Sequence, residues 1–164
     1  MHPVSQPSTP PNASRCRLLP HVIAVVCLMV LLAAPNAPAS ASDIAVVVHP
    51  DSPMTQVSVT ELRDIYLGEM TFWSGARLVP VTFQNQSPIQ ATFLQQVLGI
   101  SGNAYKTYWI KRIFREGGIP PLRVSSVEEM MHLVAHTPGA IGFVPAELAS
   151  GTSSVRQILQ IPDK

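Results

Sequence analysis

The chain has few cysteines, aromatic residues and charged residues, which are the types that form disulfides and thiolate nucleophiles and that bind nucleic acids. It contains 2 cysteines in 164 residues, and only 6% of its residues are aromatic and 13% charged. Both cysteines, Cys16 and Cys27, lie within the first 41 residues, so the remainder has no thiol for a disulfide or a thiolate nucleophile. The 11 Lys and Arg residues nearly balance the 10 Asp and Glu residues, and no basic stripe interleaved with aromatic residues is present. We therefore expect no nucleic-acid partner.

The patterns of common catalytic and metal sites are also missing. No serine occurs in the G-x-S-x-G order of a nucleophile elbow, and the few carboxylates are isolated or placed where a helix is expected to begin. His132 and His136 lie four residues apart, but the glutamate that a zinc protease carries between them is absent. We expect a protein that is not an enzyme and that holds no cofactor and no metal.

Residues 1–41 have the order of a secretory signal peptide. Two arginines precede an unbroken apolar run, residues 22–34, which is shorter than the roughly 17–25 residues needed to span a bilayer. The small-x-small pattern Ala39-Ser40-Ala41 follows. We predict cleavage after Ala41, which leaves residues 42–164 as a periplasmic domain with a net charge of about −1. An uncleaved membrane anchor is the alternative.

After residue 41, β-branched apolar runs alternate with segments that have a helical spacing of apolar residues. Strands are expected at residues 44–49, 79–83, 140–144 and 155–161, and residues 119–122 are expected to be extended because of their prolines. Helices are expected after Ser58, Ser87, Ser101 and either Ser125 or Ser126, with a helical turn at 145–149. The alternation predicts an α/β fold with a mainly parallel sheet. The strand at 44–49 is apolar throughout, which predicts an interior strand covered on both faces.

The stretch that includes the second strand and the helix after it, residues 81–93, is the most informative about function. Ser87 suits the N-cap of this helix, Pro88 its first position, and Gln90 completes a capping box. Such a turn points free backbone N–H groups and the positive end of the helix dipole at the space above the strand tip, where α/β proteins often bind ligands. We therefore predict a ligand site made by Gln84, Asn85, Gln86 and Ser87, joined by Ser52 from the loop after the first strand.

The helix expected at residues 101–115 carries aromatic and basic residues. Trp109 lies beside apolar residues, which favours core packing over an exposed stacking surface. The expected core face consists of Ala104, Tyr108, Lys111 or else Ile110, Ile113 and Phe114. The cations at the end of this helix are explained by its dipole, and an anion clamp at Arg112 is the alternative.

Several motifs, taken in order, resemble one family. They are residues 44–53, the pattern Val59-x-x-Leu62-x-x-Ile65-Tyr66-Leu67-Gly68 followed by Trp73, the strand at 79–83, Ser87, and Pro138-Gly139-Ala140-Ile141-Gly142-Phe143-Val144. Together they resemble the phosphate-type periplasmic solute-binding proteins of ABC transporters. The resemblance implies a single three-layer, periplasmic-binding-protein-like lobe, a small phosphate-like anion as ligand, and an ABC permease or another envelope protein as partner. Because complete members of this family clamp the solute between two lobes, a homo-oligomer is a further expectation.

The predicted anion loop departs from the family pattern Arg-Ser-Asp-Gly-Ser-Gly-Thr. Phe83 stands in place of the arginine, Asn85 in place of the aspartate and Pro88 in place of a glycine, whereas Ser87 is retained. Charge-assisted hydrogen bonds contribute about 1.5–3 kcal/mol each, so these losses weaken a phosphate site by orders of magnitude. The resemblance therefore implies a non-catalytic solute-binding-like protein with weak or altered anion binding. The alternative is a periplasmic interaction module that keeps the lobe as a scaffold without binding phosphate.

Overall fold

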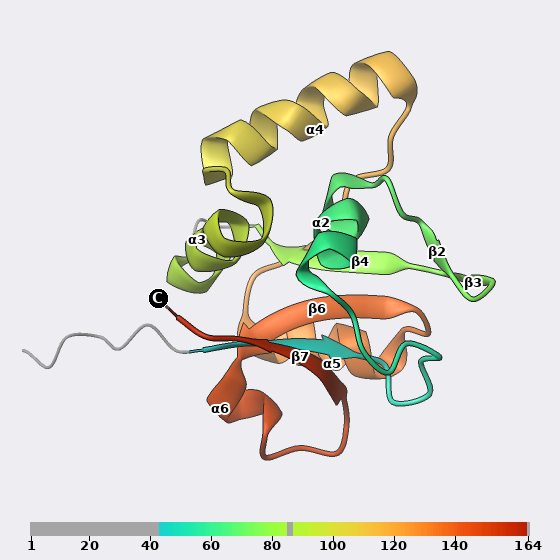
Figure 1. The fold of residues 1–164 in the computed structure, drawn as a ribbon, viewed down its shortest axis with the longest axis vertical. Helices are drawn as coiled ribbons and strands as arrows, with labels where there is room; N and C mark the ends of the chain where they lie inside the picture. The colour runs from blue at the N-terminus through green and yellow to red at the C-terminus, as the bar shows by residue number, and fades with distance from the viewer. Residues whose placement is uncertain (1–42, 85–86, 164) are drawn as a thin grey trace, which may run out of the picture. The chain divides into compact units, whose positions relative to one another are not determined.

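A mixed β-sheet organises the part of the chain that the computed structural model describes, residues 43–84 and 87–163. Five strands of this part form the sheet in the order β5-β4-β6-β1-β7 (Figure 1). They are β1 (Ile44–Val48), β4 (Val79–Phe83), β5 (Leu122–Val124), β6 (Ala140–Pro145) and β7 (Arg156–Ile161). β4 is parallel to β5 and β6, whereas β1 is antiparallel to β6 and β7. Four strands therefore point the same way, which confirms the mainly parallel sheet, and β1 runs against them.

The helices are distributed along the chain between these strands. They are α2 (Val59–Leu67), α3 (Pro88–Phe93), α4 (Gly102–Glu116), α5 (Val127–His136) and α6 (Ala146–Ala149), and a turn of π-helix, Leu94–Leu98, follows α3 directly. All of the described residues belong to one compact unit, Ser40–Lys164. No helix in residues 43–84 or 87–163 has the length and hydrophobicity needed to cross a membrane. The predicted signal peptide lies outside the described residues.

Neighbouring residues of β6 show that helices cover both faces of the sheet. Phe143 stacks on Phe93 of α3 with 3.9 Å between ring centroids, and Tyr66 of α2 lies edge-on to it at 5.9 Å. Gly142 points to the opposite face, where a Cβ would lie 2.5 Å from the sulfur of Met130 in α5. Successive residues of a strand face opposite sides, so α2 and α3 pack on one face and α5 on the other. The expected three-layer α/β architecture is confirmed.

The predicted interior strand and the predicted helix caps are confirmed. Every residue of β1 is at most 1% exposed, between β6 and β7. Ser58 and Glu61 form the reciprocal capping box of α2, because the Glu61 carboxylate accepts the Ser58 N–H at 2.8 Å and the Ser58 hydroxyl accepts the Glu61 N–H at 3.2 Å. Of the two serines before α5, Ser126 is the N-cap.

Two strand pairings were not expected from the sequence. β2 (Phe72–Trp73) and β3 (Ala76–Arg77) form a hairpin in a segment where no strand was predicted. Its two turn residues, Ser74 and Gly75, both have positive φ (47° and 84°), as a tight two-residue hairpin turn requires. β5 follows the proline-rich segment 119–121 and pairs with β4 at the edge of the sheet. Of the segment predicted to be extended, residues 119–122, only Leu122 lies in a strand, and the pairing of β5 with β4 was not predicted.

The predicted core face of α4 is right only in part: Trp109 is buried as predicted and Tyr108 packs against the core, but the predicted Ile113 and Phe114 do not. Tyr105 and Trp109 are 5% and 6% exposed, whereas Ile113 and Phe114 are 41% and 85% exposed. The reason is that α4 packs with its tyrosines on the C-terminal end of α2, which has carbonyl groups without helical partners. The Tyr105 hydroxyl donates to the Tyr66 carbonyl at 2.8 Å, and the Tyr108 hydroxyl donates to the Leu67 carbonyl at 2.8 Å.

Arg112 completes the contact between α4 and the end of α2. Its guanidinium donates to the Gly68 carbonyl at 3.2 Å and pairs with the Glu69 carboxylate at 2.5 Å, and this pairing is the main cause of its raised pKa. The guanidinium therefore lies at the negative end of the α2 dipole rather than that of its own helix. Because these groups already bind Arg112, the structure does not favour an anion clamp there.

Candidate functional site

The start of α3, at Ser87 and Pro88, has the local geometry that the sequence predicts. Ser87 is extended (φ −68°, ψ 154°), its hydroxyl accepts the Gln90 N–H at 3.4 Å, and Pro88 follows in the first turn. The N-cap serine and the proline are thus confirmed. The reason is local, because the first N–H groups of a helix have no carbonyl acceptor within the helix. The serine hydroxyl accepts one of these N–H groups, and proline has no N–H that would need an acceptor.

Of the other residues predicted to form the ligand site, Gln84 lies in the turn between β4 and α3. Its N–H donates to the Val124 carbonyl at 2.8 Å, which extends the pairing of β4 with β5, and its carbonyl accepts from Arg123 at 3.4 Å. Its side chain is exposed. Asn85 and Gln86 lie outside the described residues.

Ser52 does not lie at this turn. β1 runs against β4, so the end of β1 meets the beginning of β6, where Val48 pairs with Ile141. Val79, the first residue of β4, pairs with Ala140 at the same edge. Ser52 is thus separated from Ser87 by the length of β4, five residues at about 3.3 Å each. It is 8% exposed, and its hydroxyl accepts the Met54 N–H at 3.2 Å.

The side chain of Phe83 packs in the core and does not face the predicted anion site. It is 3% exposed, and its ring lies edge-on to Phe143 with 5.4 Å between centroids. The position that holds arginine in the resembling family therefore contributes to packing in this chain. The predicted loss of a bidentate cation at this position agrees with the burial of the Phe83 side chain.

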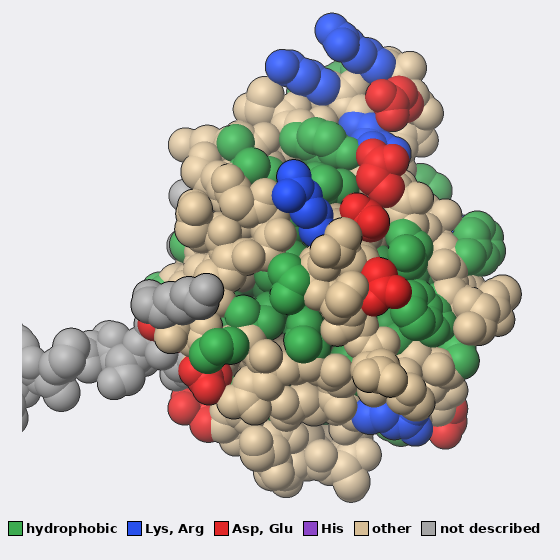
Figure 2. Space-filling model, in the orientation of Figure 1, with side chains coloured by type: hydrophobic (Ala, Val, Ile, Leu, Met, Phe, Trp, Pro, Cys, Tyr) green, Lys and Arg blue, Asp and Glu red, His purple; other side chains and the backbone are tan. Residues whose placement is uncertain are grey.

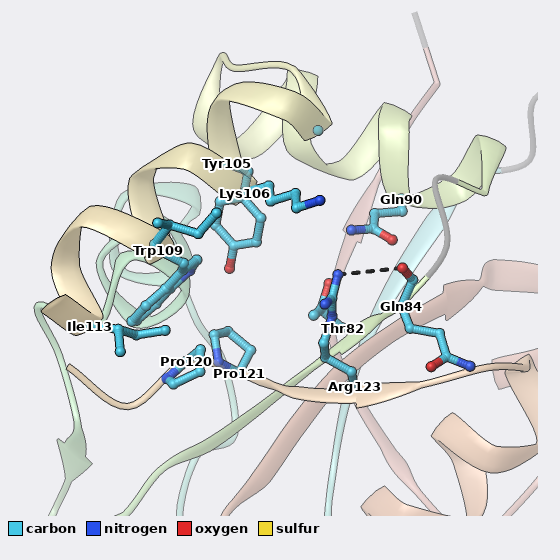
Figure 3. Close-up of a pocket in the computed structure, with 12 residues that line it drawn as sticks. Thr82, Gln84, Gln90, Tyr105, Lys106, Trp109, Ile113, Pro120, Pro121 and Arg123 are labelled. Carbon is cyan, nitrogen blue, oxygen red and sulfur yellow. Dashed lines mark hydrogen bonds between the residues drawn. The ribbon is translucent and has the colours of Figure 1, made fainter. Parts of the chain in front are cut away.

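A cavity of about 310 Å³ lies beside this turn, between α4 and the edge formed by β4 and β5. The sequence did not predict it. Its lining residues come from β4, α3, α4, β5, the turn at Gln84 and the proline segment: Thr82, Gln84, Gln90, Gly102, Tyr105, Lys106, Trp109, Ile110, Ile113, Pro120, Pro121 and Arg123. Figure 3 shows the ends of Lys106, Gln90 and Arg123 gathered on one side of this space and Trp109, Ile113 and Pro120 on the other. Thr82 and Arg123 are neighbours only through the pairing of β4 with β5. The cavity could therefore have been predicted only if that pairing had been known.

The charges around this cavity favour an anion. Lys106 and Arg123 are exposed cations, and none of the described residues that line the cavity is acidic. Burial raises the pKa of Tyr105, and the positive charge of Arg123 acts in the opposite direction. The phenol therefore stays neutral at physiological pH and does not oppose an incoming anion.

The described residues provide donors and cations but no assembled metal site. Within residues 43–84 and 87–163, no group of three or more His, Cys, Asp and Glu side chains is placed to hold a metal ion. The groups at the turn and in the cavity are hydroxyl, amide, ammonium and guanidinium groups, which can bind an anion through hydrogen bonds and charge.

Comparison with known proteins gives a fold but no family assignment. No family model and no curated protein matches the chain. Among solved structures, a candidate phosphate ABC transporter substrate-binding protein with bound phosphate from Clostridium perfringens is similar, with a TM-score of 0.56 and 19% identity over 72% of this chain and 45% of that one. An ABC-type phosphate transport receptor from Vibrio cholerae has a TM-score of 0.53 and 23% identity over 72% and 46% of the two chains. PstS from Borrelia burgdorferi has a TM-score of 0.54 and 17% identity over 71% and 47%.

These similarities bear on the fold alone, because the sequences are less than 25% identical. The chain spans less than half the length of each of these three structures. The order of strands and helices that the sequence motifs predicted is thus found in solved solute-binding proteins. The chain has the fold of the phosphate-type substrate-binding proteins of ABC transporters, over a part of their length.

Proposed function

We propose that this protein is an exported, non-catalytic solute-binding-like protein that binds a small inorganic anion weakly at the turn between β4 and α3. The observation that carries the proposal is the Ser87-capped start of α3 directly after β4, in a fold shared with phosphate-binding proteins. The ligand residues proposed are Gln84, Asn85, Gln86 and Ser87.

The available donors support weak rather than tight binding. The Ser87 hydroxyl uses an oxygen lone pair to cap α3 and keeps its own proton for an anion oxygen. The amides of Gln84, Asn85 and Gln86 are neutral donors, and neutral hydrogen bonds are roughly half as strong as charge-assisted ones. With Phe83 buried in the core, no residue of this turn is a cation. Lys106 and Arg123, from other elements, provide only longer-range attraction.

Titration calorimetry of the protein with phosphate and sulfate tests this site. We expect saturable binding in the millimolar range and an increase in Tm with anion concentration. Ser87→Ala should weaken binding at least threefold, because it removes a hydroxyl donor to the anion. Ser126→Ala is the matched control, since it removes an N-cap serine from α5, and it should lower Tm to a similar degree without changing the affinity. The absence of heat and of any Tm shift at millimolar anion would refute the ligand.

The proposal includes export and removal of residues 1–41. Expression of the full chain in a bacterium with a Sec pathway, followed by cell fractionation, should place the protein in the periplasm. Mass spectrometry of that fraction should give a chain that begins at Ser42. A full-length protein in the membrane fraction would instead support the uncleaved anchor.

The second candidate function is a periplasmic interaction module that binds an envelope protein such as an ABC permease. Large exposed apolar side chains favour it: Phe114 is 85%, Ile119 71% and Phe72 60% exposed. Figure 2 shows apolar side chains over the β2–β3 hairpin, which carries Phe72. Crosslinking in the periplasm separates the two functions, since Phe114→Ser should abolish a partner contact and leave anion binding unchanged. A self-associated form would be detected in the same experiment as a crosslinked dimer.

A further inference from the structure

The cavity between α4 and the β4–β5 edge has an apolar side and a cationic side. We propose that it binds a small organic anion with an aromatic body, of the aryl phosphonate or aryl carboxylate class. The aromatic body would lie between α4 and the prolines, and the anionic group would lie between Lys106 and Arg123. This inference goes beyond the proposed function, because it assigns another ligand class to another set of residues, of which only Gln84 is shared.

Thr82 is the first observation that points to a ligand. Its side chain lines the cavity and the residue is only 4% exposed, and its hydroxyl has no hydrogen-bond partner among the described residues. A buried hydroxyl without a partner costs about 1–3 kcal/mol, so such groups are normally satisfied. A ligand oxygen in the cavity would accept this hydrogen bond. Valine would pack equally well at this position of a strand, so packing alone gives no reason for a hydroxyl.

The two cations are the second observation. In the β4–β5 register Arg123 lies beside Thr82, so its side chain is on the same face of the sheet. Arg123 donates only one long hydrogen bond to a described residue, to the Gln84 carbonyl at 3.4 Å, which leaves most of its five donors for a ligand. Lys106 approaches from α4, and neither cation forms an ion pair with a described residue. Two unpaired cations that face one hydroxyl form a site for an anionic group.

The opposite wall determines the rest of the ligand. Trp109 and Tyr105 are buried and lie at 90° to each other with 6.4 Å between ring centroids, and Pro121 is also buried. Ile110 and Ile113 remain 45% and 41% exposed at the rim. A phosphate ion would leave these apolar surfaces against water, whereas an aromatic ring would cover them and gain about 25 cal/mol per Å² of buried apolar surface. A volume of about 310 Å³ is at the lower end of the range for small-molecule sites, about 300–1,000 Å³.

Trp109 provides a direct readout of occupancy. The chain has 2 tryptophans, so a Trp73→Phe background leaves Trp109 as the only one. We expect phenylphosphonate to change the Trp109 fluorescence with a Kd at least tenfold lower than that of inorganic phosphate or of benzyl alcohol. Equal affinities for phenylphosphonate and inorganic phosphate would overturn the proposal, because the apolar wall would then contribute nothing.

Three variants test the named contacts. Lys106→Gln and Arg123→Gln should each weaken phenylphosphonate binding at least fivefold, and Thr82→Val, which keeps the shape of the side chain, at least threefold. Lys111→Gln is the control, because it removes a cation of α4 that does not line the cavity, and it should have no effect. Phenylphosphonate binding that is unchanged in all three test variants would also overturn the proposal.

The same titrations separate this inference from the proposed function. Phosphate binding that depends on Ser87, without any preference for phenylphosphonate, would leave the anion turn supported and refute the aromatic ligand of the cavity. Phenylphosphonate binding that depends on Lys106 but not on Ser87, in a protein that does not bind phosphate, would support the cavity and refute the anion turn.

Discussion

Gly139→Ala is expected to lower the free energy of unfolding by about 3 kcal/mol or more. Gly139 has φ +81°, and a Cβ built on it would lie 2.1 Å from the carbonyl oxygen of Arg77. The left-handed conformation alone costs an L-residue about 1–2 kcal/mol, and relief of a clash with backbone costs a further 1–3 kcal/mol or so. The Gly139 carbonyl also accepts the Val79 N–H at 2.9 Å, so a shift of this turn displaces the start of β4.

Urea denaturation of the wild type and the variant measures this loss. The control is Gly75→Ala, because Gly75 has a similar φ of +84° but no atom within 4 Å of its Cβ position. This control should lose only about 1 kcal/mol, from the backbone conformation alone. If the free energy of unfolding fell equally in both variants, the close approach to the Arg77 carbonyl would not explain why position 139 needs glycine.

Phe143→Ala is expected to lower the free energy of unfolding by about 3–5 kcal/mol, the usual range for a fully buried phenylalanine. Its ring is 0% exposed and contacts the rings of Tyr66, Phe83 and Phe93, with centroid distances of 5.9, 5.4 and 3.9 Å. These residues come from α2, β4 and α3, so the cavity left by alanine would loosen the elements on both sides of the predicted anion turn.

Thermal and urea unfolding of Phe143→Ala and Phe143→Leu test this role. The leucine variant should lose less, because it fills most of the space. Phe72→Ala serves as the surface control, since Phe72 is 60% exposed on the β2–β3 hairpin, and it should change stability by no more than about 0.5 kcal/mol. If Phe143→Ala lost as little stability as the Phe72→Ala control, the aromatic cluster would not be a main source of stability. A variant that stays folded but binds anion less well would link the cluster to the turn.

The contact between α2 and α4 explains why the cavity exists. Tyr105, Tyr108 and Arg112 bind three successive carbonyls at the end of α2, and the Trp109 ring lies 2.8 Å from where a Cβ of Gly68 would be. These hydrogen bonds hold the side of α4 that carries Trp109 against α2 and the sheet. The same face of α4 therefore closes one side of the cavity, while Ile113 at its rim stays partly exposed.

Local patterns were sufficient to predict the α/β class, the interior position of β1, and the serine caps of α2, α3 and α5. Each of these features depends on residues within about one helical turn or one strand. An N-cap needs a side-chain oxygen three residues before the N–H that it accepts, and a strand covered on both faces needs an unbroken apolar run. The Ser87 turn was predicted for the same reason, because Ser87, Pro88 and Gln90 are adjacent in the sequence.

Only the tertiary structure decided which predicted site residues lie together. An apolar run does not encode the direction of its strand, so the antiparallel orientation of β1, which separates Ser52 from Ser87, was not readable from it. The pairing of β5 with β4, which places Arg123 beside Thr82, joins residues about forty positions apart. The buried face of α4 depended in the same way on unpaired carbonyls of another helix rather than on its own apolar spacing. Burial patterns and caps are local properties of the chain, whereas strand direction and strand pairing are set by contacts between distant segments, and the cavity is built from such contacts.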